Sequence, residues 1–300
     1  MDKTRKWTDK QLQQMERHIA GIYRRASADV KKAADDYFGQ FSRLDKQKRQ
    51  AVKDGKLSDA EYKTWRKNKM LYSQRFTDLQ QQISMKLLHT NETALAYING
   101  ELPEIYSVNY NAIAPDLSWI DGYSFTMVDA NTVKNLATTD KSFLPYKKLD
   151  PSKDIPWNMR AINTQVLQGI LAGESIPKIS ARMLEVQAMD AAASVRTART
   201  VVTASECKGR YDSYRKAQGD GVIMGKYWIS NHSERTRDWH ADAGDNYSRD
   251  KAIPIDQPFE VRGEYLMYPG DTSLGATGKN IYNCRCSVGT VILGFRKVKK

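Results

Sequence analysis

The amino-acid sequence predicts an α+β protein with a long helical hairpin at the N-terminus, a helical middle and a small mixed α/β domain at the C-terminus. Apolar residues recur every three or four positions over the first part of the chain, which is the period of an amphipathic helix. Prolines punctuate the next stretch, and strand-like runs gather after Gly219. We therefore expect a basic helical hairpin over residues 1–100, a connector over 101–155 and a domain over 156–300.

The first helix of the hairpin is expected to begin at Thr8, because Thr8 and Gln11 form a capping-box pattern. Apolar or small side chains then recur from Leu12 to Leu44 at a mean spacing between 3.5 and 3.6 residues. This spacing places them in one stripe, so the helix is expected to bury one face against a partner.

The second helix of the hairpin is expected to follow a polar turn at residues 53–56. Ser58 and Glu61 form a second capping box. An apolar stripe then runs from Tyr62 to Leu87. Two long amphipathic helices with a short link favour an antiparallel pair.

The connector is defined by its prolines, which interrupt long helices. They are Pro103, Pro115, Pro145, Pro151 and Pro156. Residues 122–128 are expected to form a short strand, and Asp129 is expected to cap a short helix that ends at Ala137.

Three helices are expected after the connector. Pro156 suits the first turn of one helix, which is expected to end at Gly173. Ser175 precedes a second helix, and Asp190 is expected to cap a third that ends at Gly219.

The C-terminal segments have the composition of strands. Residues 222–230 and 287–295 are rich in β-branched and aromatic side chains. Residues 259–261 and 265–268 flank Arg262-Gly263, which predicts a tight hairpin. Helices followed by clustered strands predict an α+β domain.

Charge and cysteine content bound the class of protein. The 300 residues carry a net charge of +12, and the first 100 hold 21 Lys or Arg against 12 Asp or Glu. No apolar run is long enough to span a membrane, and the first residues lack the apolar core of a secretion signal. Three cysteines are too few for a disulfide framework and favour a reducing compartment.

The region from Arg196 to Thr290 carries an ordered set of motifs. These are RTART at 196–200, Gly221-Val222 followed by Trp228, ERTRDWH at 234–240, PGD at 269–271 and NCRC at 283–286. Their order and spacing resemble the phage Mu F-like head morphogenesis domain, with its core motifs over 196–290. The resemblance covers the last third of the chain, and the helices from about residue 156 look like its usual lead-in.

The resemblance implies a non-enzymatic minor capsid protein that lies in the virion, inside the capsid near the portal, and in the host cytoplasm during assembly. It implies a role in procapsid assembly and in DNA packaging or ejection. The implied partners are the portal protein, the major capsid or scaffold protein, and double-stranded phage DNA bound without sequence preference. No membrane partner is expected.

Three of the motif side chains are suitable zinc ligands. His240, Cys284 and Cys286 offer one nitrogen and two sulfurs, and His232 is a candidate fourth ligand eight residues before His240. The alternative is a hydrogen-bonded histidine beside two small buried thiols. No cofactor is certain from the sequence, and structural zinc is one of these two interpretations.

The remaining motif residues are expected to hold the domain together. Arg235, Arg237 and Arg285 are candidates either for phosphate or portal contact or for internal ion pairs. Trp228 is expected in the core, and Pro269, Gly270 and Asp271 are expected to form a turn. Asn283 is expected to bond to the backbone.

Eight basic residues of the hairpin are candidates for contact with DNA or the portal: Arg24, Arg25, Lys31, Lys32, Lys63, Arg66, Lys67 and Lys69. Phosphate contacts of this kind carry no base information. A solvated helical surface is the alternative interpretation.

Two rival functions remain open. Glu234, Asp238 and Asp245 lie close to His232 and His240 in sequence, which is compatible with a metal-dependent nuclease or toxin-like enzyme. No recognised catalytic motif supports that interpretation, and we predict that the chain is not an enzyme. The second rival is a portal adaptor that makes no DNA contact.

Overall fold

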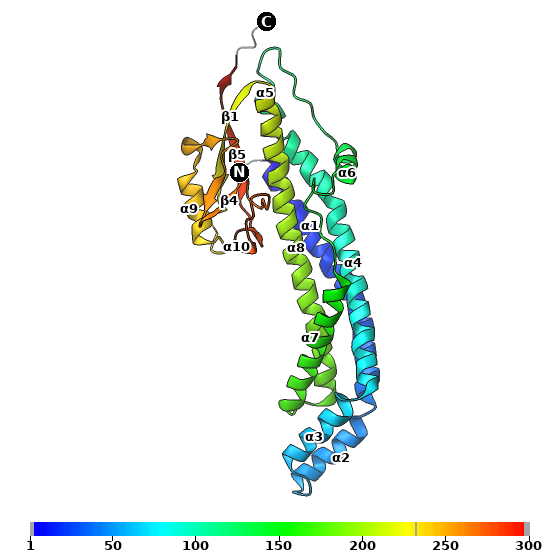
Figure 1. Cartoon of the computed structure of the whole chain (residues 1–300). Coiled ribbons are helices and arrows are strands. Elements are labelled where there is room, and N and C mark those ends of the chain that lie inside the picture. Colours follow the sequence, from blue (N-terminus) through cyan, green and yellow to red (C-terminus); the bar gives the residue numbers. More distant parts are fainter. Residues whose placement is uncertain (1–2, 232, 297–300) are drawn as a thin grey trace. The chain divides into compact units, whose positions relative to one another are not determined.

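The computed structural model describes residues 3–231 and 233–296, and its helices and strands confirm the predicted α+β class (Figure 1). In chain order the elements are α1 (Lys3–Gly39), α2 (Ser42–Lys53), α3 (Asp59–Met70), α4 (Gln74–Asn111), α5 (Ala114–Leu117), α6 (Ala130–Thr139), α7 (Pro151–Leu171), α8 (Ile176–Gly219), β1 (Val222–Ile229), α9 (Asp238–Asn246), the 3₁₀ turn η1 (Arg249–Lys251), β2 (Ile253–Pro254), β3 (Phe259–Val261), β4 (Glu264–Leu266), α10 (Gly278–Ile281) and β5 (Ser287–Phe295).

The chain folds into two compact units. The α/β unit consists of residues 1–16, 97–147 and 195–300, and the helical unit consists of residues 17–96 and 148–194. The boundary predicted at residue 100 falls inside α4. Each unit therefore draws on segments that are far apart in the sequence.

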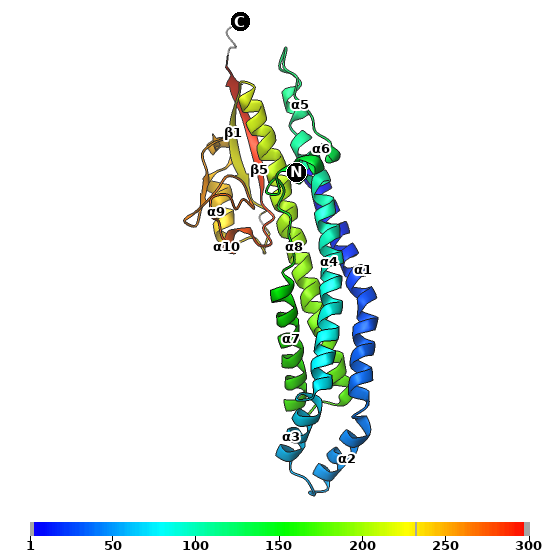
Figure 2. The same cartoon turned by 45° about the vertical axis from the view of Figure 1, so that its right-hand side comes forward.

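Each long helix of the predicted N-terminal hairpin is interrupted. The first breaks between Gly39 and Ser42, and the second breaks between Met70 and Gln74, where the Ser73 hydroxyl accepts a hydrogen bond from the Phe76 amide. The result is that α1 and α4 are connected through α2 and α3, which form a shorter hairpin beyond the ends of the two long helices (Figure 2).

One predicted capping box is confirmed and the other is wrong. Ser58 caps α3 through reciprocal bonds with Glu61, at 3.2 and 2.9 Å. Thr8 lies inside α1, which begins at Lys3. Its buried hydroxyl donates to the Thr4 carbonyl and accepts a hydrogen bond from Asn109, so it is not free to cap a helix.

The core of the helical unit is formed by apolar side chains from α1, α3, α4, α7 and α8. Its fully buried members include Val30, Ala34, Phe38, Met70, Phe76, Ile83, Leu87, Ile162, Val166, Ile170, Ile179, Met183 and Val186. The apolar stripes predicted for the first part of the chain thus meet stripes from the later helices. This burial supplies most of the driving force for folding of the unit.

A buried ion pair links α2 to α3. The Arg66 guanidinium is 0% exposed, and its Nε lies 2.8 Å from Oδ1 of Asp45. The Tyr62 hydroxyl donates to the same oxygen at 2.7 Å, and Nη2 of Arg66 donates to the Glu174 carbonyl at 2.6 Å. Removal of the carboxylate would leave a buried cation without its counter-charge.

Substitution Asp45→Ala is therefore expected to lower the free energy of unfolding by about 3 kcal/mol, which is typical for a buried pair that loses one partner. The matched control is Asp59→Ala, because Asp59 pairs with Lys63 at 2.7 Å on the surface. A much smaller loss is expected there. Urea unfolding followed by circular dichroism measures both. Equal losses would contradict the structural role assigned to Asp45.

A polar cluster is buried among the helices of the same unit. Asp190 accepts a hydrogen bond from Nδ2 of Asn91 at 3.1 Å, and the Tyr23 hydroxyl contacts both Asn91 and Ser194. Burial raises the pKa of Asp190 to about 6. The prediction that Asp190 begins a separate helix is wrong, because α8 runs unbroken from Ile176 to Gly219 and Asp190 serves this cluster instead.

The folded state therefore holds the Asp190 proton more tightly than the unfolded chain does. This favours folding at acidic pH, and the contribution is lost as pH rises from about 4 to about 6. The variant Asp190→Asn has no proton to lose at this position. Its free energy of unfolding should therefore change less between pH 4 and pH 7 than that of the wild type, by on the order of 2 kcal/mol. Asp36→Asn, at an exposed site of α1, is the control. Parallel pH profiles for wild type and Asp190→Asn would refute the assignment.

The connector differs from the prediction in two of its elements. The prediction of a strand over residues 122–128 is wrong, and at the end of this segment the Val128 amide donates to the Asn111 side chain at 3.0 Å. The Asp129 cap is confirmed, since its carboxylate accepts from the Thr132 amide at 2.7 Å.

Two prolines lie inside helices. Pro103 does not end α4, since the adjacent Leu102, Ile105 and Tyr106 are buried and their packing outweighs one missing backbone bond. Pro156 is likewise internal to α7, which begins at Pro151 instead.

Strands β1, β3, β4 and β5 confirm the segments that the sequence predicts, whereas β2 was not predicted. The three-stranded sheet has the order β2-β1-β5. Strands β1 and β5 are antiparallel: Val222 lies opposite Phe295 at one end and Ile229 lies opposite Ser287 at the other, with a bulge between Ile223 and Met224. β3 and β4 form the hairpin, and its turn residues Arg262 and Gly263 have φ of 51° and 75°.

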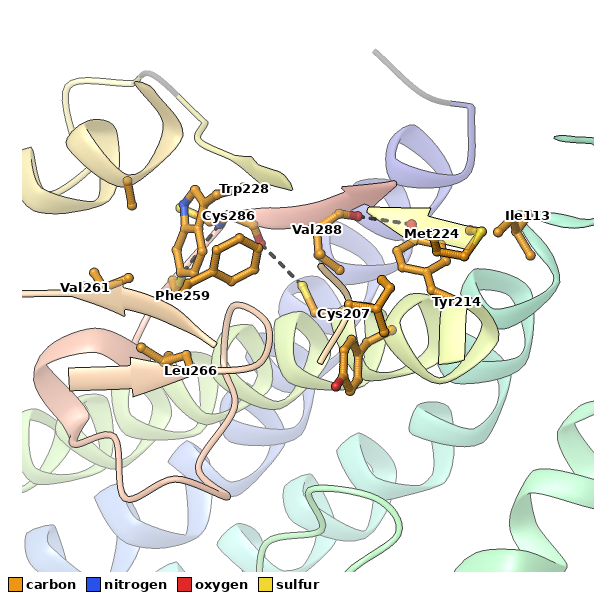
Figure 3. Close-up of a cluster of buried hydrophobic side chains, with 14 of the residues drawn as sticks. Ile113, Cys207, Tyr214, Met224, Trp228, Phe259, Val261, Leu266, Cys286 and Val288 are labelled. Carbon is orange, nitrogen blue, oxygen red and sulfur yellow. Dashed lines mark hydrogen bonds between the residues drawn. The ribbon is translucent and has the colours of Figure 1, made fainter. Parts of the chain in front are cut away.

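The core of the α/β unit lies between the sheet and α8 (Figure 3). Trp228 is 2% exposed, as predicted for a core residue. Its ring packs edge to face against that of Phe259, with 5.4 Å between the ring centres. The Cys207 thiol on α8 donates to the Cys286 carbonyl at 3.6 Å. Gly209 lets α8 approach α4 closely, because a Cβ there would lie 2.5 Å from the Tyr106 carbonyl oxygen.

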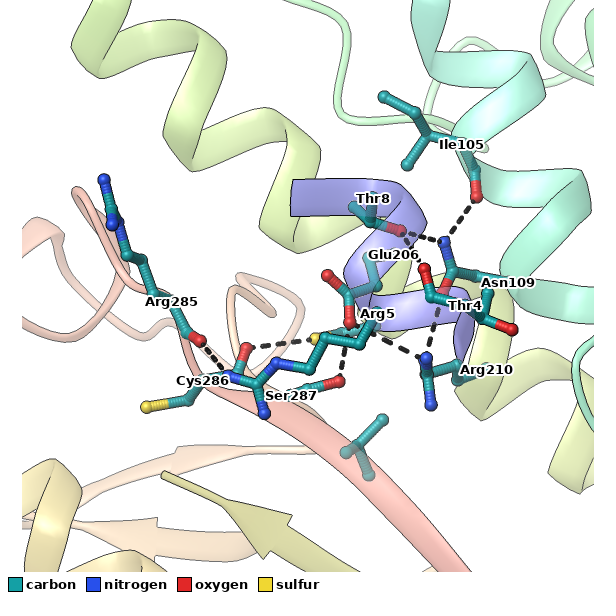
Figure 4. Close-up of polar contacts among 12 residues, drawn as sticks. Thr4, Arg5, Thr8, Ile105, Asn109, Glu206, Arg210, Arg285, Cys286 and Ser287 are labelled. Carbon is teal, nitrogen blue, oxygen red and sulfur yellow. Dashed lines mark hydrogen bonds and ion pairs between the residues drawn. The ribbon is translucent and has the colours of Figure 1, made fainter. Parts of the chain in front are cut away.

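The first turns of α1 are tied into this unit by a buried polar network (Figure 4). Arg5 donates to the Arg285 carbonyl at 2.8 Å. On α8, Glu206 accepts from the Ser287 hydroxyl at 2.7 Å and lies 3.6 Å from Arg210, whose Nε donates to Asn109. Burial raises the pKa of the Glu206 carboxyl. The network thus joins α1, α4, α8 and β5.

Candidate metal centre

Three predicted ligands meet where the Cys-Arg-Cys segment passes α9. Nδ1 of His240 lies 3.5 Å from Sγ of Cys284 and 3.5 Å from Sγ of Cys286. The three ligand atoms lie within 4.8 Å of one another, and all three side chains are buried. They form the one group of at least three such ligands in residues 3–231 and 233–296.

Backbone hydrogen bonds position the two thiols. Asn283, which precedes the first cysteine, adopts φ of 56°, and its backbone N–H donates to the Thr200 hydroxyl at 3.2 Å. The Thr203 hydroxyl donates to the Cys284 carbonyl at 2.6 Å. The Cys286 amide donates to Sγ of Cys284 at 3.4 Å. The threonines of α8 thus hold the segment in a turn that directs both sulfurs toward His240.

Asn280 fixes the orientation of the imidazole. Its Nδ2 donates to the Val261 carbonyl at 3.1 Å and to Oε2 of Glu264 at 2.8 Å, so its Oδ1 is left as an acceptor. That oxygen lies 2.8 Å from Nε1 of Trp239 and 3.2 Å from Nε2 of His240. Nε2 therefore carries a hydrogen, and Nδ1 faces the sulfurs.

Asn280 and Glu264 were missed by sequence reasoning. Asn280 is buried in the short helix α10, and Glu264 opens β4. An asparagine and a glutamate in loop-rich sequence carry no distinctive signal by themselves. Their role becomes visible only when the fold brings them behind His240.

The two thiols share their ionisation. The hydrogen bond from Cys284 lowers the pKa of Cys286, and His240 lowers it further. The same bond, with burial, raises the pKa of Cys284. Burial also raises the pKa of Cys207, the third cysteine. The pair therefore favours a thiolate at Cys286, which is the form in which cysteine binds metals.

A pocket of about 310 Å³ opens beside the three ligands. Its lining residues are Arg199, Asn231, Ser233, Arg235, Thr236, Arg237, His240, Asn283, Cys284, Arg285 and Cys286. Four arginines thus surround one hollow, and Arg199 pairs with Glu16 at 2.6 Å. Arg237 donates to the backbone carbonyl of Tyr282, whereas the sequence interpretation had offered an internal ion pair. Arg235 and Arg285 are exposed, and neither forms an ion pair with a residue that the structure describes.

The Pro-Gly-Asp motif forms a turn against α8. Gly270 has φ of 88°, and a Cβ there would lie 3.0 Å from Cα of Ala204. The buried Asp271 carboxylate accepts from the amides of Met267 and Ser273, each at 2.8 Å. Pro269, Gly270 and Asp271 thus have a structural explanation, as the turn prediction stated.

The eight basic candidates lie in the helical unit and differ in exposure. Arg24, Arg25, Lys31 and Lys32 are exposed on α1; Lys69 is exposed and Lys63 and Lys67 are half-buried on α3. Arg66 is wrong as a contact residue, because it is buried in its pair with Asp45. The sequence prediction omitted four further exposed cations of this region, Arg43, Lys46, Lys53 and Lys56.

Other predicted site residues are not brought together. His232 lies outside the described residues. Glu234, Asp238 and Asp245 are exposed and belong to no group of three or more metal-binding side chains in the described part of the chain. No helix among the described residues is both long and apolar enough to cross a membrane.

Comparison with known proteins gives one match. Residues 160–289 match the family model described as Phage Mu protein F like protein. The matched segment begins in α7 and ends in β5, so it includes α8, the arginine-lined pocket and the three metal-binding side chains. Comparisons with curated proteins and with solved structures gave no match. Over residues 160–289 the match supports a phage Mu F-like head morphogenesis protein, which is the family that the ordered motifs also resemble.

Proposed function

We propose that the protein is a minor head component that associates with the portal inside the capsid and acts in procapsid assembly and in DNA packaging or ejection. The family match supports a role in the phage head. The observation that carries the finer proposal is the exposed cationic surface of the hairpin formed by α2 and α3.

This surface has few compensating acids. Residues 42–70 contain ten Lys or Arg against four Asp or Glu. One of the four acids, Asp45, is buried against Arg66, and a second, Asp59, pairs with Lys63. The exposed cations Arg43, Lys46, Lys53, Lys56 and Lys69 form no ion pair with other residues in 3–231 or 233–296.

Such a surface attracts polyanions through counterion release, without recognition of base sequence. Phage DNA is the polyanion that a head protein meets during packaging. Lys48 lies 5.4 Å from the ring centre of the half-buried Trp65, so an aromatic side chain is interleaved with the cations. We therefore place non-specific DNA contact on α2 and α3, with the exposed cations of α1 as a second contributing set.

The proposal is tested by reversing charge on the hairpin with Lys46→Glu, Lys53→Glu, Lys56→Glu and Lys69→Glu together. We expect DNA affinity to fall strongly, and the slope of log affinity against log salt to fall by about one for each phosphate that the hairpin no longer neutralises. The matched control reverses four exposed cations of the α/β unit, Lys134, Arg196, Arg249 and Lys279. Fluorescence anisotropy with a short duplex measures both.

The outcome also separates the rival partners. Affinity for DNA that does not depend on salt, or an equal decrease in the control, would contradict electrostatic binding by the hairpin. Failure of purified portal protein to capture the hairpin variant, with DNA binding unchanged, would assign the surface to the portal. If none of the portal, major capsid and scaffold proteins captures the wild-type chain, the assembly role is refuted.

A further inference from the structure

We propose that His240, Cys284 and Cys286 bind one Zn²⁺ ion, and that the fourth coordination position faces the arginine-lined pocket and takes an oxygen of a phosphate-type anion. This inference rests on the α/β unit alone. It is independent of the DNA-binding role proposed for the helical unit.

The two nitrogen–sulfur distances of the ligand group fit a tetrahedral zinc ion. With Zn–S of about 2.3 Å, Zn–N of about 2.0 Å and tetrahedral angles, a nitrogen and a sulfur ligand lie about 3.5 Å apart. Both distances from Nδ1 of His240 to the sulfurs are 3.5 Å. The ligands are thus held near their binding positions, so little reorganisation accompanies binding.

The surroundings of the ligands also fit a metal. A histidine ligand commonly donates its other ring N–H to an oxygen acceptor, and His240 does so to Asn280, which is itself held by Glu264. Zinc binding requires both cysteines as thiolates and the imidazole in its neutral form. The burial of two thiolates is costly without a cation, and Zn²⁺ removes that cost by neutralising them.

The fourth position distinguishes this centre from a closed structural site. Closed sites take four protein ligands, whereas the described residues supply three here, and all three also line the pocket. One Zn²⁺, two thiolates and a neutral imidazole have no net charge. The positive charge of the surrounding arginines is therefore not cancelled by the centre, and exposed Arg235 and Arg285 present guanidinium groups that suit phosphate oxygens.

The metal is tested on the full chain, purified without chelators and analysed for zinc by mass spectrometry. We expect about one zinc per chain, with loss of zinc in Cys284→Ser and Cys286→Ser. Cys207→Ser is the matched control, because Cys207 is buried but lies outside the ligand group, and the serine hydroxyl can still donate to the Cys286 carbonyl, so this variant should keep the metal. Asn280→Ala should weaken zinc binding by about tenfold or more.

Cobalt substitution of the wild-type chain gives a test that does not depend on variants folding. Two thiolate ligands should produce charge-transfer absorption and a tetrahedral visible spectrum when Co²⁺ is added. Absence of both stoichiometric zinc and this spectrum would overturn the metal site and leave His240 as a hydrogen-bonded histidine beside two thiols.

The anion is tested by adding inorganic phosphate to the cobalt form. We expect the visible bands to shift, and the double variant Arg235→Gln/Arg285→Gln to need at least several-fold more phosphate for the same shift. Arg196→Gln, an exposed arginine of α8 that does not line the pocket, is the control. No shift at any phosphate concentration would overturn the open position. Loss of zinc in His232→Ala would also overturn it, because the fourth ligand would then come from the protein.

Discussion

Hydrogen bonds to the main chain of the Cys-Arg-Cys segment are the constraint on which the α/β unit depends. Thr203 of α8 holds the carbonyl of Cys284, Cys207 of α8 holds that of Cys286, and Arg5 of α1 holds the carbonyl between them. These partners satisfy buried polar groups that would otherwise oppose folding. They also set the direction of both thiols and the start of β5, so the sheet and the candidate metal centre share one set of supports.

The sequence predicted the features that depend on local chemistry. The β3–β4 hairpin follows from Arg262-Gly263, and the caps at Ser58 and Asp129 follow from side chains that bond to amides three residues away. Helix interruptions were harder to predict. Pro103 suggested a break where buried neighbours maintain α4, while the real break before Gln74 lies in sequence without proline or glycine.

The sequence predicted the three metal-binding side chains of the candidate site but not the residues that orient them. The ordered motifs indicated His240 and the two cysteines, which follow His240 by 44 and 46 residues along the chain. No local pattern marks Asn280 as the residue that orients the imidazole. For Arg66 the sequence predicted a contact residue where there is none. Its lysine-rich helix suggested an exposed cation, but Arg66 is buried in an ion pair with Asp45 of another helix. Both errors arise from long-range pairing, which periodicity does not report.

The bond between Arg5 and Arg285 joins residues 280 positions apart, which has a consequence for how the chain is made. At ordinary rates of translation, the ribosome needs about 15–60 s to add the residues between them. During that interval the first turns of α1 have emerged, while β5 has not yet been synthesised. The buried contact of Arg5 is therefore completed only after the Cys-Arg-Cys segment has been synthesised, so this side chain waits for its partner while the residues between them are added.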